Sequence, residues 1–183
     1  MAELKLAPDE VSSTTVKWRA RLRELLSSTS RTSKLALVGL GHPLRGDDYV
    51  GSFIVKTLMS ECRRDGVSFF DAEDGVERVV SQISKLNPKQ VVFVDACDMN
   101  ARAGDIALIP LAETNYPFFT THGIPLKLLA SRFLPESENW LLAIQPDIME
   151  VNGHLSERVN RSAVDISSFI SATLEEVGPT HGD

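Results

Sequence analysis

The sequence has few of the features that mark secreted, membrane or nucleic-acid-binding proteins. Its 183 residues include two cysteines, Cys62 and Cys97, too few for a disulfide framework, which favours a reducing compartment. Its longest apolar runs are about six residues, far short of a membrane span, and the N-terminus lacks the basic and apolar stretches of a signal peptide. The net charge of −6 argues against a nucleic-acid or anionic-membrane surface. We therefore expect a cytoplasmic globular protein.

The sequence also lacks the usual motifs of hydrolytic enzymes. It contains no GxSxG nucleophile elbow and no HExxH zinc motif. Neither cysteine lies in a catalytic signature, and we expect Cys97 to be buried behind a strand. A serine, cysteine or zinc hydrolase of the common types is therefore disfavoured.

A glycine-rich bend after the apolar residues 35–40 is the most informative stretch. A dinucleotide fingerprint would need a third glycine at Leu44, and a phosphate loop would continue with lysine where Asp47 and Asp48 stand. Two carboxylates repel phosphate, so a phosphate-handling enzyme is a weak alternative. The structural alternative is a tight strand–helix turn in which one of these aspartates caps a helix and the other lies beside its positive end.

Apolar runs alternate with helical patterns along the chain, which predicts an α/β protein. Strands are expected at 35–40, 67–70, 90–94, 105–109 and 140–144, and helices at 14–26, 48–63, 75–86, 125–133 and 156–177. We expect a three-layer sandwich: a five-stranded, mostly parallel twisted sheet with one short antiparallel strand and helices on both faces.

One domain is expected to hold this sheet. Residues 1–33 form an N-terminal arm, a short helix and a linker; residues 34–177 form the single α/β domain; residues 178–183 form a flexible tail. The N-terminal helix is either an appendage to the core or a lid over its side.

Three polar residues are expected to meet at the carboxyl edge of the sheet, where α/β proteins bind ligands. Asp48 follows the first strand, Asp95 ends the most apolar strand, and His122 lies in a loop that opens a helix. Two carboxylates and an imidazole suit a transition metal with open positions. The alternatives are a loop cap at Asp95 and a structural or exposed histidine at His122. His42, in the glycine-rich bend, is a second candidate histidine.

Five segments resemble one family when they are taken in order. GLGHPLRGDDYVG resembles the opening motif of the hydrogenase maturation endopeptidases, GxGNxLxxDDGxG, and FFDAEDGVE, VVFVDACDM and FFTTHGIPL resemble their next three segments. AIQPDI resembles a fifth segment, typical of the formate-hydrogenlyase branch (group 4, hydrogenase 3-type). Together these segments cover about residues 35–175. The chain departs from the family at His42, which replaces an asparagine, and at Tyr49, which replaces a glycine.

The resemblance implies a five-stranded α/β sandwich and an aspartic-type endopeptidase. Such an enzyme removes the C-terminal extension of a [NiFe]-hydrogenase large-subunit precursor after nickel insertion. The metal ligands would be Asp48, Asp95 and His122, with the nickel carried by the substrate and no permanent cofactor.

Roles and partners follow from the same resemblance. The catalytic residues would be Asp48 and Asp95, with Asp48 as general base. Arg45 or the amides of the glycine loop would stabilise the developing oxyanion. The expected substrate-binding residues are Gly41, His42, Arg45 and Asp47. The expected partners are the precursor and nickel-insertion accessory proteins. A non-cleaving, nickel-sensing chaperone or scaffold for the large subunit is the alternative.

Overall fold

The computed structural model describes residues 8–114, 124–147 and 153–177. Its strands are β1 (Leu35–Leu40), β2 (Val67–Glu73), β3 (Gln90–Ala96), β4 (Ile106–Pro110) and β5 (Glu138–Ile144). Its α-helices are α1 (Pro8–Ser27), α2 (Val50–Glu61), α3 (Val80–Leu86), α4 (Leu126–Phe133) and α5 (Glu157–Glu176). Short 3-10 helices are η1 (Gly46–Tyr49), η2 (Val76–Arg78) and η3 (Leu111–Glu113).

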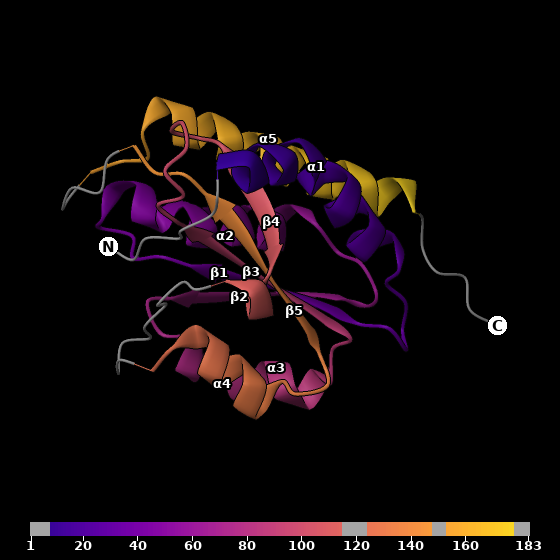
Figure 1. The fold of residues 1–183 in the computed structure, drawn as a ribbon. Helices are drawn as coiled ribbons and strands as arrows, with labels where there is room; N and C mark the ends of the chain where they lie inside the picture. The colour runs from indigo at the N-terminus through magenta and orange to yellow at the C-terminus, as the bar shows by residue number, and fades with distance from the viewer. Residues whose placement is uncertain (1–7, 115–123, 148–152, 178–183) are drawn as a thin grey trace.

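The strands form one five-stranded sheet in the order β2-β1-β3-β5-β4. β1, β2, β3 and β5 are parallel, and β4 pairs antiparallel with β5. Helices α1, α2 and α5 cover one face, and α3 and α4 cover the other (Figure 1). The predicted α/β sandwich, with its single antiparallel strand, is therefore confirmed.

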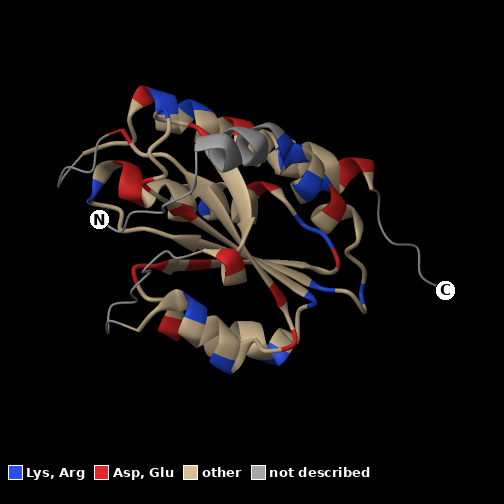
Figure 2. Cartoon of the chain, in the orientation of Figure 1, with Lys and Arg blue, Asp and Glu red and all other residues tan. Residues whose placement is uncertain are grey.

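The central strand β3 is buried along its whole length, because helices cover both of its faces. Val92 and Val94 point into the hydrophobic core under α2 and α5, whereas Val91 and Phe93 point into the core under α3 and α4. Charged residues of both signs are interspersed along α5 and the described part of α1 (Figure 2). The uninterrupted apolar run in the sequence is the consequence of this two-sided burial.

The N-terminal helix α1 is longer than expected and is built into one of the two cores. Trp18, Leu22 and Leu25 are buried in the same hydrophobic cluster as residues of α2 and α5. The Trp18 ring packs edge-on against Phe169 of α5, with ring centroids 5.4 Å apart. This helix is thus a packed part of the helical layer that it shares with α2 and α5.

Two helix starts differ from the sequence expectation. The helix expected at 48–63 begins as the 3-10 turn η1, and the residue before α2 is Tyr49, with no side-chain cap. The expectation that an aspartate caps this helix is therefore wrong. The helix expected at 75–86 is split into η2 and α3, because Val79 between them has a φ of −111°, far from the helical value.

None of the helices in the described ranges is long and apolar enough to cross a membrane.

The start of α2 lies directly on the backbones of β1 and β3. A Cβ atom on Gly51 would overlap the carbonyl oxygens of Val94 and Leu40, and one on Gly39 would overlap the carbonyl oxygen of Gly51. Only glycine leaves room for this approach. The first and last glycines of GLGHPLRGDDYVG are therefore required by packing.

Gly51→Ala is expected to destabilise the fold by roughly 3 kcal/mol, because the added methyl group meets rigid backbone. Thermal unfolding measures the loss. Gly75→Ala is the matched control, since a Cβ there meets only the side chain of Arg78, which can move. Equal melting temperatures for the two variants would contradict this account.

Candidate active site

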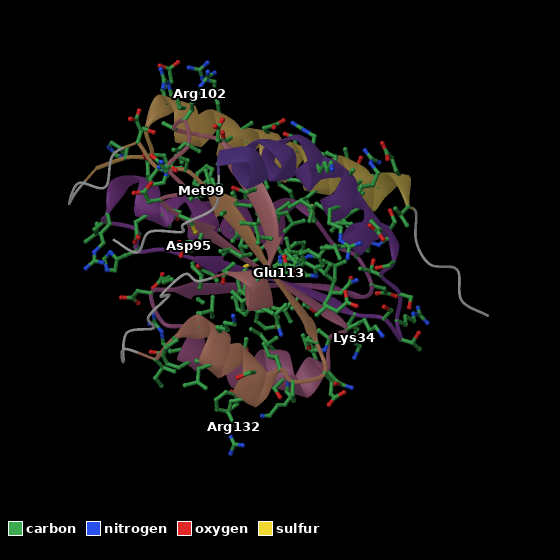
Figure 3. All side chains as sticks on the ribbon, viewed as in Figure 1. Lys34, Asp95, Met99, Arg102, Glu113 and Arg132 are labelled. Carbon is green, nitrogen blue, oxygen red and sulfur yellow. The ribbon has the colours of Figure 1, made fainter. Side chains whose placement is uncertain are left out.

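The site lies where β1 and β3 end. β1 is connected to β2 through α2, and β2 is connected to β3 through α3. These two connections cross opposite faces of the sheet, since α2 and α3 lie on opposite sides (Figure 1). In open α/β sheets such a switch point creates the ligand-binding crevice at the carboxyl ends of the strands. Asp95 marks this end of the sheet and Lys34 the opposite end (Figure 3).

The loop after β1 folds back on itself so that Asp48 returns to the strand end. Gly41 has a φ of +114°, and a Cβ there would overlap the Asp48 carbonyl oxygen. The Gly41 N–H donates to the carbonyl oxygen of Glu73 on β2 at 2.8 Å. The Asp48 carboxylate accepts a hydrogen bond from the His42 N–H at 2.9 Å. This bond holds the carboxylate at the mouth of the loop.

Several amides of the loop already donate hydrogen bonds. The Leu44 N–H donates to Nδ1 of His42 at 3.2 Å, and the Arg45 N–H donates to the His42 carbonyl oxygen at 3.1 Å. The N–H groups of Gly41 and His42 are also engaged, so these four amides are occupied. The other amides of the loop and the exposed side chain of Arg45 stay the predicted candidates for the oxyanion contact.

Asp95 is buried at the end of β3, with 6% of its surface exposed. Its Oδ1 accepts a hydrogen bond from the Ala96 N–H at 2.7 Å. Burial, reinforced by the nearby charge of Asp48, raises the pKa of Asp95 well above its ordinary value of 3.8, against the lowering effect of the Ala96 hydrogen bond. The sequence-predicted aspartates are thus brought into electrostatic contact. Carboxylate pairs whose environments differ are typical of acid–base sites.

The third predicted ligand, His122, lies outside the described residues. Asp95 points to the same face of the sheet as Phe93, which is the face that α4 covers. α4 begins at Leu126, shortly after His122 in the sequence. Within the described ranges, no three His, Cys, Asp or Glu side chains are grouped so that they could hold a metal ion. The metal trio therefore stays a prediction.

Asp47 has a different role from the substrate contact expected for it. Its side chain is fully buried, and its two carboxylate oxygens accept hydrogen bonds from the N–H groups of Asp147 (2.8 Å) and Ser156 (2.6 Å). Ser156 is the N-cap of α5. A side chain enclosed in this way cannot contact a protein substrate, so this expectation is wrong. Asp47 instead joins the loop to the chain that follows β5.

Gln145 is a site-supporting residue that sequence reasoning did not single out. Its Oε1 accepts hydrogen bonds from the N–H groups of Met99 (2.7 Å) and Ala101 (3.2 Å), and its Nε2 donates to Asp98 at 3.3 Å. It therefore organises the chain that leaves Asp95. The signal was present as a polar residue followed by proline directly after an apolar strand.

A second charged cluster lies on β2 beside the loop. Asp71 accepts a hydrogen bond from Ser52 at 2.6 Å and forms an ion pair with Lys56 at 3.0 Å, while Glu73 lies 3.4 Å from the same ammonium group. Burial lowers the pKa of Lys56, but the contacts with Asp71 and Glu73 outweigh it and raise that pKa. These carboxylates are thereby neutralised in place, unlike the pair formed by Asp48 and Asp95.

Comparisons with known proteins found relatives of one functional class. No family model matches the chain. The hydrogenase 3 maturation protease of Escherichia coli K12 is 30% identical over 115 residues, which cover 62% of this chain and 73% of that protein. A protein of Methanocaldococcus jannaschii assigned to the hydrogenase maturation proteases is 25% identical over 163 residues, 84% of this chain and 95% of that protein.

A solved structure extends the comparison to the fold. The crystal structure of the [NiFe] hydrogenase maturation protease HycI from Thermococcus kodakarensis superposes with a TM-score of 0.75 at 25% identity, covering 85% of this chain and 99% of that one. The α/β sandwich described above is thus the fold of a known class of peptidases. The chain belongs to the hydrogenase maturation protease family.

Asp47→Ala is expected to cost about 3 kcal/mol of folding stability, because it leaves two backbone N–H groups without their acceptor. Amide hydrogen exchange should speed up at Asp147 and Ser156 before it does so in β3. Asp165→Ala serves as control: it removes an exposed ion pair with Arg19, which contributes little. Unchanged exchange at both amides would contradict the anchoring role.

Asp95→Asn is expected to stabilise the protein increasingly as the pH rises. Because the pKa of Asp95 is raised in the folded protein, its contribution to folding stability is fully present below the unfolded-state pKa. That contribution is lost as the pH rises through the folded-state pKa. Asparagine cannot ionise, so the gain in melting temperature over the wild type should grow from pH 4 to pH 8.

Melting temperatures of both proteins, measured in the presence of a chelator, test this expectation. Asp165→Asn, an exposed position, should show no such trend. A difference between Asp95→Asn and the wild type that does not change with pH would contradict it.

Proposed function

We propose that this chain is an endopeptidase that removes the C-terminal extension of a [NiFe]-hydrogenase large-subunit precursor after nickel insertion. The observation that carries the proposal is that two carboxylates, Asp48 and the buried Asp95, lie close enough at the switch point of the sheet to affect each other's charge. The names of the relatives support the substrate class, since one acts in hydrogenase 3 maturation and the other is a [NiFe] hydrogenase maturation protease.

Recognition of the precursor depends on nickel that belongs to the substrate. Asp48, Asp95 and His122 supply oxygen and nitrogen donors, which a divalent nickel ion accepts. A cation would offset the cost that burial and the charge of Asp48 impose on an ionised Asp95. A precursor without nickel lacks this contact, so processing follows metal insertion and the enzyme needs no resident cofactor.

Hydrolysis is assigned to the side chains around the loop. Asp48, oriented by the His42 N–H, takes a proton from a water molecule whose oxygen attacks the scissile carbonyl carbon. The exposed guanidinium group of Arg45 stabilises the oxyanion that forms. As the C–N bond breaks, the proton passes from Asp48 to the leaving nitrogen. This sequence gives the enzyme its aspartic-type character.

The surroundings of the reaction follow from the same proposal. Cys62 and Cys97 are both free thiols, which fits a reducing compartment such as the cytoplasm, where the precursor would be assembled. Nickel-insertion accessory proteins would act on the precursor before this enzyme does.

Asp95→Asn and His122→Ala are each expected to abolish processing, because each removes a group that engages the substrate's nickel. Purified nickel-loaded precursor is mixed with each variant, and the shortening of the large subunit is followed on a denaturing gel. The control is Asp98→Asn, which should still cleave. Asp98 is a neighbouring carboxylate that accepts hydrogen bonds from a backbone N–H and from Gln145.

Normal cleavage by Asp95→Asn would sink the nickel-engagement mechanism. A stable, uncut complex between the wild type and the nickel-loaded precursor would instead identify a non-cleaving chaperone.

A further inference from the structure

A groove that the proposed reaction does not use runs along the outer edge of β2. β2 is the last strand of the sheet and pairs with β1 on one side only. Beside it lies a cavity of about 670 Å³, walled by the end of α2, the first half of β2 and the end of α3. The opposite edge strand, β4, is almost entirely buried and is packed against α1, whereas Ser68, Phe69 and Phe70 of β2 are only half-buried.

The backbone of β2 presents hydrogen-bonding groups to this groove. The Leu35 N–H donates to the carbonyl oxygen of Gly66 at 2.8 Å, and Leu35 is in register with Val67. In a parallel ladder, alternate residues then turn their backbone groups to the neighbouring strand. Ser68 and Phe70 therefore bond to β1, and the N–H and C=O of Phe69 point off the free edge.

The side chains around this edge also match an extended peptide. Phe69 packs against the core under α2, and Phe70 packs against the core under α3, so the groove straddles the edge of the sheet. Met59, 42% exposed, overhangs one face, and Leu86 overhangs the other. An added strand places alternate side chains on opposite faces, where these two overhangs would contact them.

Positive charge is concentrated at the end of the groove where β2 begins. Arg63 is exposed there, and Arg64 is half-buried, with its Nη1 donating to the Leu174 carbonyl oxygen at 2.6 Å. The Nε and Nη2 atoms of Arg64 are buried and have no partner among the described residues. Asp65, on the same rim, is paired with Arg31. In a chain of net charge −6, this end of the groove favours a carboxylate.

The other end of β2 leads to the active site. The Glu73 carbonyl oxygen accepts the hydrogen bond from Gly41, so the strand end touches the loop that carries Asp48. From Phe69 to Glu73 the strand advances about 13 Å. A peptide laid along the edge of β2 therefore enters the crevice within a few residues.

We propose that the edge of β2 binds the C-terminal extension of the precursor as an added strand, with apolar side chains over Met59 and Leu86 and a carboxylate near Arg63 and Arg64. This inference rests on the proposed function. On the proposed function, nickel would hold the part of the precursor upstream of the scissile bond, so the downstream extension is the part left to lie along the strand.

Steady-state processing of nickel-loaded precursor tests the proposal. Met59→Glu and Arg63→Glu should each raise KM about tenfold and leave kcat within about twofold, since both residues lie away from the reacting atoms. The KM of Arg63→Glu should also depend less on salt than that of the wild type. Arg132→Glu, which reverses a charge that points away from the sheet on α4 (Figure 3), should behave as the wild type. An unchanged KM in both groove variants would overturn strand addition.

Amide exchange gives a second readout that does not need cleavage. A synthetic peptide with the sequence of the extension should slow exchange at Phe69 and leave Leu108 of β4 unchanged. No slowing at Phe69 would overturn the proposal, as would protection of Phe69 without peptide in a species with the mass of two chains.

The two proposals fail in distinguishable ways. A wild type that leaves the precursor uncut contradicts the proposed function, whereas a wild type that cuts, with groove variants of unchanged KM, contradicts strand addition alone.

Discussion

The contact of α2 with the backbones of β1 and β3 is the constraint on which the rest of the site depends. Gly39 and Gly51 remove the side chains that would hold the helix away from the sheet. With the helix start this close, the intervening loop must turn sharply, and Gly41 adopts the positive φ that the turn requires. The loop then closes on itself, and Asp48 lies above the end of β3. Without this approach, the Asp48 carboxylate would not influence Asp95.

Two adjacent aspartates in this loop are separated by their surroundings into different tasks. Asp47 points inward, where backbone N–H groups from two distant segments satisfy its charge. Asp48 points to the crevice, where its negative charge acts on a second carboxylate, that of Asp95. The first arrangement joins distant segments by hydrogen bonds, whereas in the second, burial and the charge of Asp48 disfavour a negative charge on Asp95. The hydrogen bonds of Asp47 therefore hold Asp48 close to Asp95, where the two carboxylates repel each other. A bound cation would reduce this repulsion.

The order and type of the strands could be predicted from the sequence because apolar runs bounded by turns are a local signal. β1 was predicted with its observed ends, and Asp95 was found because it interrupts the most apolar strand. The roles of Asp47 and Asp48 at the helix start could not be predicted, since they depend on partners such as Ser156 that are remote in sequence. The anchoring role of Gln145 was missed for the same reason: its partners follow the neighbouring strand β3 and are remote in sequence.

The strand order also links the chemistry to the open edge of the sheet. The switch point lies between β1 and β3, so the strand made directly after α2 is placed outside β1 and becomes the edge. Its neighbour β1 carries the loop with Asp48, and the bond between Gly41 and Glu73 joins that loop to the edge strand itself. The opposite edge is packed against α1 and so is not equivalent. A chain that pairs with β2 would therefore extend the same sheet whose carboxyl ends hold the two aspartates. Backbone pairing would fix its direction and its distance from Asp48 with little dependence on its side chains. On the proposed function, such a placement suits a substrate that a metal ion would position on one side of the scissile bond, since the added strand would position the other side.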